Sequence, residues 1–278
     1  MTELATDRVL VIGAGLGALY AALALAPRPV LVISPDPLGQ GASSAWAQGG
    51  VAAAMADTDS PEAHAVDTIR AGAGIVAAEV AAQVTEEARR HILDLTAMGA
   101  PFDRTPSGGY VLSREAAHSM ARVVRVKGDQ AGAEIMAALV AQTRAAVHIQ
   151  VIEGALATGL IVEGGQVVGA EIARVSGAAL SQSVRLRAAA VVLAGGGAGG
   201  LYAVTTNPSR ICGQALGLAA RAGAVVSDPE FVQFHPTAID LGRDPAPLAT
   251  EALRGAGGVL VNGDGGRFMV GVHPDAEL

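Results

Sequence analysis

Residues 8–18 have the sequence RVLVIGAGLGA, in which a β-branched run enters a glycine turn. Arg8–Ile12 predicts a short buried strand. An Ala- and Leu-rich helix is expected to follow the turn and to end near Ala26, before Pro27. Val30–Ile33 then predicts a second buried strand. This strand–helix–strand order predicts a parallel sheet of the Rossmann-like, dinucleotide-binding α/β class.

The glycine turn has the GxGxxA spacing of a dinucleotide site. Gly13 permits the tight turn, Gly15 lets a pyrophosphate approach the backbone, and Ala18 lets the helix pack on the strand. The pyrophosphate would lie on free N–H groups at the positive end of the helix dipole. A purely structural glycine turn is the alternative, but the flanking strand and helix favour cofactor binding. The predicted cofactor-binding residues here are Gly13, Ala14, Gly15, Leu16, Gly17 and Ala18.

The second strand lacks the acid that usually follows it. An Asp or Glu at that place binds the ribose hydroxyls of the cofactor, but Ser34 stands there and becomes the candidate cofactor-binding residue. Asp36 is close by, yet it follows Pro35 and would serve equally well to cap a turn. What holds the ribose therefore stays open, and plain NAD specificity is not supported.

The composition excludes several classes of protein. Hydrophobic residues make up 51% and charged residues 16% of the 278 residues, which excludes disorder. A net charge of −7 and an aromatic content of 3% argue against a nucleic-acid partner. Cys212 is the only cysteine, so no internal disulfide or CxxC metal site is expected and a reducing cytoplasm is the simplest setting. We expect no signal peptide and no membrane span.

Further elements follow from periodicity and from capping residues. The predicted helices are Pro61–Ala71 with Ser60 as N-cap, Ala77–Met98, Asp129–Arg144 and Cys212–Ala222. Residues 148–193 predict a small antiparallel β-meander, and its last part, 189–193, returns to a buried strand. After Phe231 the chain is polar and loop-like. We therefore predict two domains, 1–232 and 233–278.

Four more motifs lie in order along the chain. They are SSAWAQGG at Ser43–Gly50, SREAAHS at Ser113–Ser119, FVQFHPT at Phe231–Thr237 and TEALRG at Thr250–Gly255. The first resembles the flavin loop of the fumarate reductase and succinate dehydrogenase flavoprotein superfamily. The third and fourth resemble its active-site strand and next substrate loop. The second is similar to the substrate-side motif of the L-aspartate oxidase family.

The resemblance implies FAD as the cofactor, bound by 1–232, with 233–278 as the start of an α+β capping domain. Ser43 stands where the covalent members of the superfamily have a histidine, so FAD is expected to bind non-covalently. The implied cofactor-binding residues are Ser43, Ser44, Ala45, Trp46, Ala47, Gln48, Gly49, Gly50 and, from a later glycine run, Gly196.

The same resemblance implies oxidation of L-aspartate to iminoaspartate, with oxygen or fumarate as the electron acceptor. This is the first step of de novo NAD formation, with quinolinate synthase as an expected partner. Two residues are implied to be catalytic: Glu115, which would recognise the substrate ammonium group, and His235, which would bind a carboxylate. Gln233, Thr250, Glu251 and Arg254 are the implied substrate-binding residues.

Each of these residues has a structural alternative. His235 would instead be a buried structural histidine, Gln233 an edge polar residue and Glu115 a solvated loop acid. Thr250 and Glu251 would only cap a helix. For Arg254 the structural role, holding the loop, is favoured. The histidines without a motif around them are read as surface or core residues: His64, His91, His148 and His273.

The chain departs from the family pattern in places. Cys212–Ala215 replaces the usual Thr-Gly-Asp-Gly, Ala116 and Ala117 replace glycines, and the sequence stops at Leu278, before the family's catalytic arginine. This chain alone is therefore expected to be poorly active. Two other hypotheses stay open: a flavoprotein that acts on succinate or fumarate, and a non-catalytic FAD-binding module.

Overall fold

The computed structural model describes residues 2–177, 179–274 and 276–277, so the predicted loop at 273–278 is described only in part. The chain divides into two compact units. The first contains Met1–Trp46 and Ile135–Pro247, and the second contains Ala47–Glu134 and Leu248–Leu278. The predicted boundary near residue 232 concerns the family's domain limits and stays a prediction.

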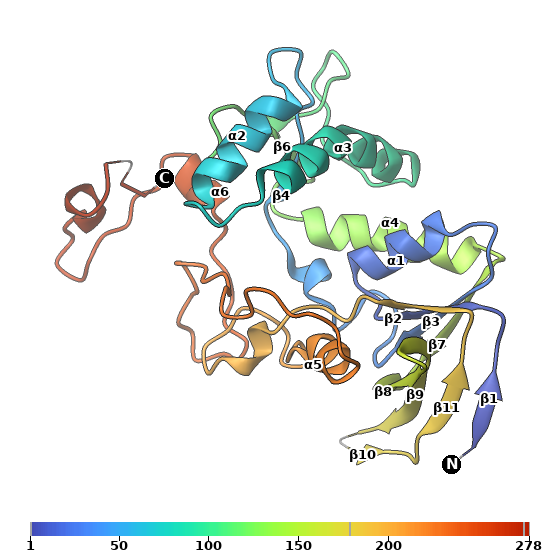
Figure 1. Cartoon of the computed structure of the whole chain (residues 1–278). Coiled ribbons are helices and arrows are strands. Elements are labelled where there is room, and N and C mark those ends of the chain that lie inside the picture. The colour runs from blue at the N-terminus through green and yellow to red at the C-terminus, as the bar shows by residue number, and fades with distance from the viewer. Residues whose placement is uncertain (1, 178, 275, 278) are drawn as a thin grey trace. The chain divides into compact units, whose positions relative to one another are not determined.

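The first unit is built on a parallel sheet with the strand order β12-β2-β3-β7. Its strands are β2 (Val9–Ile12), β3 (Val30–Ser34), β7 (Ile149–Glu153) and β12 (Ala190–Leu193) (Figure 1). Helix α1 (Leu16–Ala24) joins β2 to β3 and packs against both strands. This arrangement confirms the predicted α/β class and the βαβ unit.

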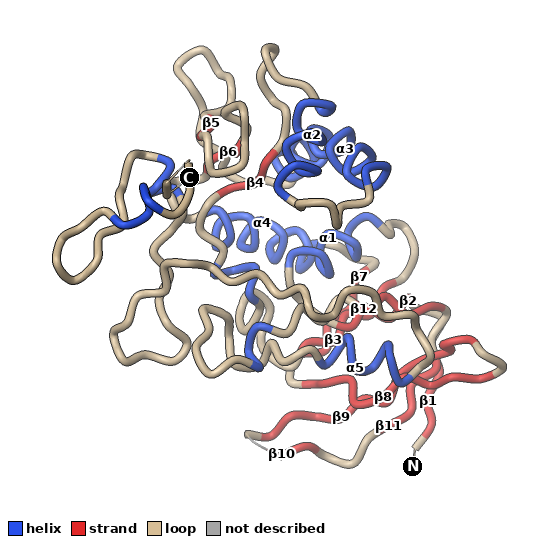
Figure 2. Tube along the Cα trace, turned by 60° about the vertical axis from the view of Figure 1, so that its left-hand side comes forward, coloured by secondary structure: helices blue, strands red, loops and turns tan. Residues whose placement is uncertain are grey.

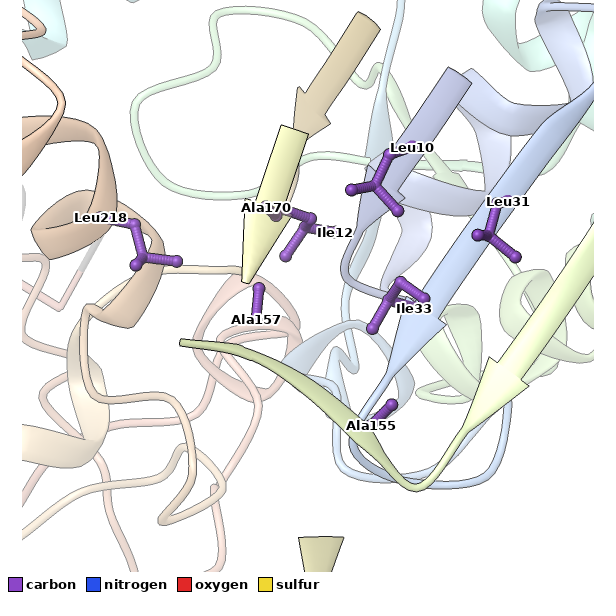
Figure 3. Packing of buried hydrophobic residues seen from close by; sticks show 8 residues of the cluster. All are labelled: Leu10, Ile12, Leu31, Ile33, Ala155, Ala157, Ala170 and Leu218. Atoms are coloured by element: carbon purple, nitrogen blue, oxygen red, sulfur yellow. The ribbon is translucent and has the colours of Figure 1, made fainter. Parts of the chain in front are cut away.

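The core of this unit lies between the parallel sheet and a second sheet. Leu10 and Ile12 of β2, with Leu31 and Ile33 of β3, point to the same face because side chains alternate along a strand. Figure 3 shows these four residues together with their buried neighbours from other elements: Ala155, Ala157, Ala170 and Leu218. The small alanines let the second sheet approach the first closely.

The second sheet is the predicted antiparallel meander. It contains β8 (Ala155–Glu163), β9 (Gln166–Ser176), β10 (Ala179–Leu180) and β11 (Val184–Arg187) (Figure 2). Strand β1 (Glu3–Ala5) pairs in parallel with β11 and was not predicted.

Two strand predictions need correction. The meander was predicted to begin at residue 148, but β7 pairs in parallel with β3 and belongs to the first sheet. An apolar run does not show which partner it will pair with. Strand β12 was predicted to be buried, but Ala190 is exposed and Val191–Leu193 are half-buried. The reason is that β12 is an edge strand with β2 on one side.

The second unit combines helices with a short sheet. Helices α2 (Pro61–Ala71) and α3 (Ala78–Ala97) pack together, and β4 (Gly50–Ala52), β6 (Val123–Arg125) and β5 (Leu112–Ser113) pair antiparallel. The Ser60 Oγ accepts a hydrogen bond from the Ala63 N–H at 3.1 Å, which confirms the predicted N-cap. The remaining helices are α4 (Ala131–Ala145), α5 (Gln214–Arg221) and α6 (Ala252–Gly255). Among the described residues, no helix is both long enough and apolar enough to cross a bilayer.

Candidate functional site

A cavity of about 340 Å³ opens in the first unit at the carboxyl ends of β2 and β3. Ligands of open parallel sheets bind at this edge, and the volume falls in the range of roughly 300–1,000 Å³ usual for small-molecule sites. Most of the predicted cofactor-binding residues of this unit line it: Gly13, Ala14, Gly15, Leu16, Gly17, Ser34, Ser43, Ser44 and Gly196.

The turn after β2 leaves no room for a larger residue. Gly13 has φ of +120°, and a Cβ added there would lie 2.1 Å from the carbonyl oxygen of Ala194. Gly15 is the N-cap of α1 and brings no side-chain oxygen, while the Leu16 N–H donates to Ser44 Oγ at 3.0 Å. The backbone N–H groups at a helix start have no partner within the helix. The turn therefore fits the pyrophosphate of a dinucleotide.

The flavin-loop motif crosses the boundary between the two units. In the first unit, Ser43–Trp46 forms a short 3-10 helix, and Ser43 Oγ donates to Asn207 Oδ1 at 2.8 Å. In the second unit, the Oε1 atom of Gln48 is buried and has no hydrogen-bond partner among the described residues. Buried polar atoms are nearly always paired, so a bound group is the expected partner of this oxygen.

Three of the predicted motifs meet inside the second unit. A Cβ added to Gly49, at the end of the flavin loop, would lie 3.5 Å from Glu115 Oε1. A Cβ added to Gly255, at the end of the TEALRG motif, would lie 2.8 Å from the Arg114 carbonyl oxygen. Only Gly255 is needed for a close approach, because a Cβ at Gly49 would make an ordinary contact; both positions bring their segments next to the loop that carries Glu115.

Glu115 is a half-buried acid in the loop between β5 and β6. Among the described residues, none lies within ion-pair distance of its carboxylate and none donates a hydrogen bond to it. Burial raises the pKa of Glu115, and the negative charge of Glu251 raises it further, against a smaller opposing effect of Arg125. A cation placed beside this carboxylate would relieve both penalties.

The TEALRG residues mainly contact one another. Thr250 Oγ1 accepts a hydrogen bond from the Ala252 N–H at 3.4 Å, but Glu251, the N-cap residue of α6, makes no side-chain capping bond. Arg254 donates from Nη1 to the Glu277 carbonyl at 2.9 Å and lies 3.7 Å from Glu251 Oε1. These contacts hold the segment together. The substrate-binding roles of Thr250, Glu251 and Arg254 stay predictions.

The predicted active-site strand at 231–237 is not a strand. Its backbone makes turn bonds instead, such as Phe231 N–H to the Asp228 carbonyl at 3.1 Å. Gln233 and His235 are therefore not aligned on one face of a strand. Gln233 is exposed, and the half-buried His235 accepts a bond at Nδ1 from the Thr237 N–H at 3.3 Å. Both residues lie in the first unit, and their roles stay predictions.

A buried charge network in the second unit was missed by the sequence analysis. Arg122, whose side chain is 0% exposed, donates to Asp59 at 2.9 Å through both Nε and Nη2 and pairs with Asp67 through Nη1. Asp67 in turn accepts from Ser119 N–H and Oγ, both at 2.7 Å. The network thus anchors the end of the SREAAHS loop that carries Glu115.

Two histidines belong to the same network. The rings of His64 and His118 lie 5.5 Å apart, and His118 Nδ1 is 3.3 Å from Arg122 Nη1. Burial and then the Arg122 charge lower the pKa of both imidazoles, so both are neutral near pH 7. The only sequence signal was weak: His64 and Asp67 are three residues apart and share one face of α2.

Acid is expected to weaken the second unit through this network. Hydrogen bonds from Arg122 lower the pKa of Asp59. Burial alone would raise the pKa of Asp67, but hydrogen bonds from Ser119 and Arg122 outweigh the effect of burial, so that this pKa is lowered as well. Because both folded-state values lie below the unfolded value of about 3.9, the stability they add is present above that pH and lost below it. Urea unfolding midpoints, followed from neutral pH down to about pH 3, should fall more steeply for the parent than for Asp67→Asn. Equal slopes would contradict the assignment.

Known proteins resemble this chain along nearly its whole length. The family model described as an FAD binding domain matches residues 8–278. The L-aspartate oxidase of Caulobacter vibrioides is 57% identical over 272 residues, which cover 96% of this chain and 52% of that protein. That of Agrobacterium fabrum is 44% identical, covering 98% and 51%. The chain thus spans about half the length of these curated relatives.

Solved structures give the same picture of the fold. A mutant of the FrdA chain of E. coli quinol fumarate reductase superimposes with a TM-score of 0.88 at 29% identity, covering 97% of this chain and 45% of that one. Sdh1 of Mycobacterium smegmatis, in complex with UQ1, gives 0.81 at 32% identity, covering 100% and 48%.

Proposed function

The chain belongs to the FAD-binding domain family, and from this premise we propose that it serves the FAD-dependent oxidation of L-aspartate to iminoaspartate. Its similarity to L-aspartate oxidases supports the reaction. The structural observation that supports it best is the half-buried Glu115 carboxylate beside Gly49 of the flavin loop, which has no ion-pair partner in the part of the chain that the structure describes. Such a carboxylate suits a substrate with an ammonium group.

FAD, when bound, would supply the acceptor for the hydride that leaves the α-carbon of the amino acid, and a proton would leave its ammonium group so that the imine forms. The chain's own residues bind and position the partners. The turn at Gly13–Ala18 receives the pyrophosphate at the start of α1. Ser43, hydrogen-bonded to Asn207, holds its part of the flavin loop without a covalent link to the cofactor.

Glu115 orients the amino acid through its ammonium group. His235 and Gln233 are proposed to bind a substrate carboxylate, and Thr250 and Glu251 to frame the substrate. Arg254 fixes the segment that carries Thr250 and Glu251 through its bond to the Glu277 carbonyl. The electrons pass on to oxygen or fumarate. We further propose that the product feeds quinolinate formation, with quinolinate synthase as the partner, in the reducing cytoplasm that a single cysteine favours.

The test is reduction of the bound cofactor without oxygen. A protein that contains this sequence and has the full length of the curated relatives is loaded with FAD and desalted, and L-aspartate or succinate is then added while the visible flavin absorbance is recorded. We expect L-aspartate to bleach the flavin band and iminoaspartate to form. Bleaching by succinate and not by L-aspartate would instead place the protein with the enzymes of succinate and fumarate. No bleaching by either would contradict the proposal.

Replacing Glu115 with glutamine is expected to weaken L-aspartate binding and to stabilise the fold. Loss of the opposite charge should raise the L-aspartate dissociation constant roughly 10- to 100-fold, as for a charged hydrogen bond. The raised pKa means that ionised Glu115 destabilises the folded protein at neutral pH. The neutral amide should therefore raise the thermal unfolding midpoint. Flavin spectral titration and a thermal melt measure the two effects.

Succinate is the matched control for this substitution because it has two carboxylates and no ammonium group. Its affinity should not fall from the parent to Glu115→Gln, because no ammonium contact is lost and one negative charge is removed. If the variant lost stability, or lost succinate and L-aspartate binding equally, Glu115 would be a structural acid and not the ammonium site.

A further inference from the structure

The residue at the usual ribose position is already engaged. Ser34 ends β3 and is 2% exposed, and its Oγ donates to the Asp36 carbonyl at 2.6 Å. The hydroxyl thus closes a tight turn over Pro35. Because Ser34 is almost completely buried, it is a poor acceptor for the FAD ribose, whereas this turn carries the Asp36 side chain to the wall of the cavity.

Asp36 provides the only carboxylate among the described residues that line the cavity. Its Oδ2 lies 3.0 Å from Arg210 Nε, in the loop before α5. The same oxygen is close to Gly41, where an added Cβ would lie 2.2 Å away. Its Oδ1 has no hydrogen-bond partner among the described residues. One oxygen is therefore fixed, and the other is available to a ligand.

The turn that carries Asp36 is also held from its far side. Glu153, the last residue of β7, accepts a hydrogen bond at Oε1 from the Leu38 N–H at 2.8 Å. Ser34 thus bonds to the backbone of Asp36 itself, and Glu153 bonds to the backbone two residues later. Together the two bonds restrict the backbone conformation of the turn. A carboxylate held in this way loses little entropy when it binds a ligand.

We propose that Asp36 binds the adenosine ribose of FAD, in place of the acid missing at residue 34, and that Arg210 is the positioning residue for its carboxylate. The ribose hydroxyls donate and Asp36 Oδ1 accepts. Arg210 holds the carboxylate in one orientation through Oδ2 while leaving Oδ1 to the ligand. The chain thus obtains its ribose acid two residues later than the usual place.

The experiment compares FAD with FAD analogues made from 2′-deoxy- or 3′-deoxyadenosine. Dissociation constants are measured by quenching of flavin fluorescence, without any substrate. The parent is expected to bind FAD roughly 10- to 100-fold more tightly than at least one of the two analogues. Asp36→Ala and Asp36→Asn should bind FAD more weakly by a similar factor, and Asp36→Ala should no longer distinguish FAD from that analogue.

Two further variants complete the test. Arg210→Met should weaken FAD binding less than Asp36→Ala and should reduce, without abolishing, the preference for FAD over the analogue. Asp7→Asn, an exposed acid in the same unit, should bind both as the parent does. Far-UV circular dichroism checks that each variant is folded.

Clear results would overturn the proposal. If the parent chain bound FAD and both analogues with equal affinity, a ribose contact would be excluded. This result can be obtained without any variant. The proposal would also be wrong if Asp36→Ala preferred FAD over the analogues as strongly as the parent does. It would be wrong as well if the parent chain bound neither FAD nor the analogues. The proposal rests on FAD binding and not on the proposed reaction. A failure of L-aspartate to reduce the flavin would leave the binding result unchanged.

Discussion

Replacing Arg122 with leucine is expected to destabilise the second unit by about 3–5 kcal/mol, the usual cost of removing one partner from a buried ion pair. The substitution leaves Asp59, whose side chain is 0% exposed, and Asp67, which is 4% exposed, without their cation. It also weakens the anchor of Ser119, because the Asp67 carboxylate that accepts its hydrogen bonds is no longer held by Arg122.

The loss is measured by urea unfolding together with hydrogen exchange of α2 and of residues 115–122. Arg122→Lys should fall between the parent and the leucine variant, because an ammonium keeps the charge but cannot make the same forked contacts with two carboxylates. Arg90→Leu removes an exposed ion pair with Glu87 and should change little. Unchanged exchange in Arg122→Leu would show that the network does not support this unit.

Replacing Gly13 with alanine is expected to weaken FAD binding by a factor of about 100 or more, or about 2.8 kcal/mol. The new methyl group would meet the Ala194 carbonyl oxygen at 2.1 Å and its carbon at 2.7 Å, and both are backbone atoms just after β12. The backbone conformation, with φ of +120°, is also strained for any side chain. The turn and β12 must move apart, which opens the pyrophosphate site.

Fluorescence titration with FAD measures this loss, and far-UV circular dichroism shows whether the variant still folds. Gly263→Ala is the matched control, because a Cβ there meets nothing within 4 Å and the residue lies outside the cavity. If Gly13→Ala bound FAD within a factor of two or so of the parent, the close approach of the turn to Ala194 would not be required for binding.

The nucleotide-binding part of the fold could be predicted because its signals are local in the sequence. A β-branched run, a GxGxxA turn and an Ala-rich helix follow one another within residues 8–26. Each has a signal that can be read from near neighbours, namely strand propensity, a glycine at a positive φ and a helix pattern, although the contact of Gly13 with Ala194 could not be predicted in this way. The meander was predicted for the same reason, since hairpin turns such as Gly164-Gly165 join strands that pair with each other.

The parts that failed depend on partners far along the chain. Arg122 finds Asp59 and Asp67 at separations of 63 and 55 residues, and no periodicity in the sequence connects them. For β7, the sequence shows an apolar run but not the partner strand. The strand predicted at 231–237 came from a motif alone, and nothing local in that segment fixes an extended ladder.

The parallel sheet also sets an order of events while the chain is being made. Strands β2 and β3 have both been synthesised by residue 34. The second partner of β3, strand β7, follows only at residues 149–153, and the second partner of β2, strand β12, only at residues 190–193. Until then, two apolar strands emerge from the ribosome with open edges, which favour pairing with other chains. The sheet is complete only once residue 193 has been synthesised, and pairing over such long separations in sequence makes slow folding the expected behaviour.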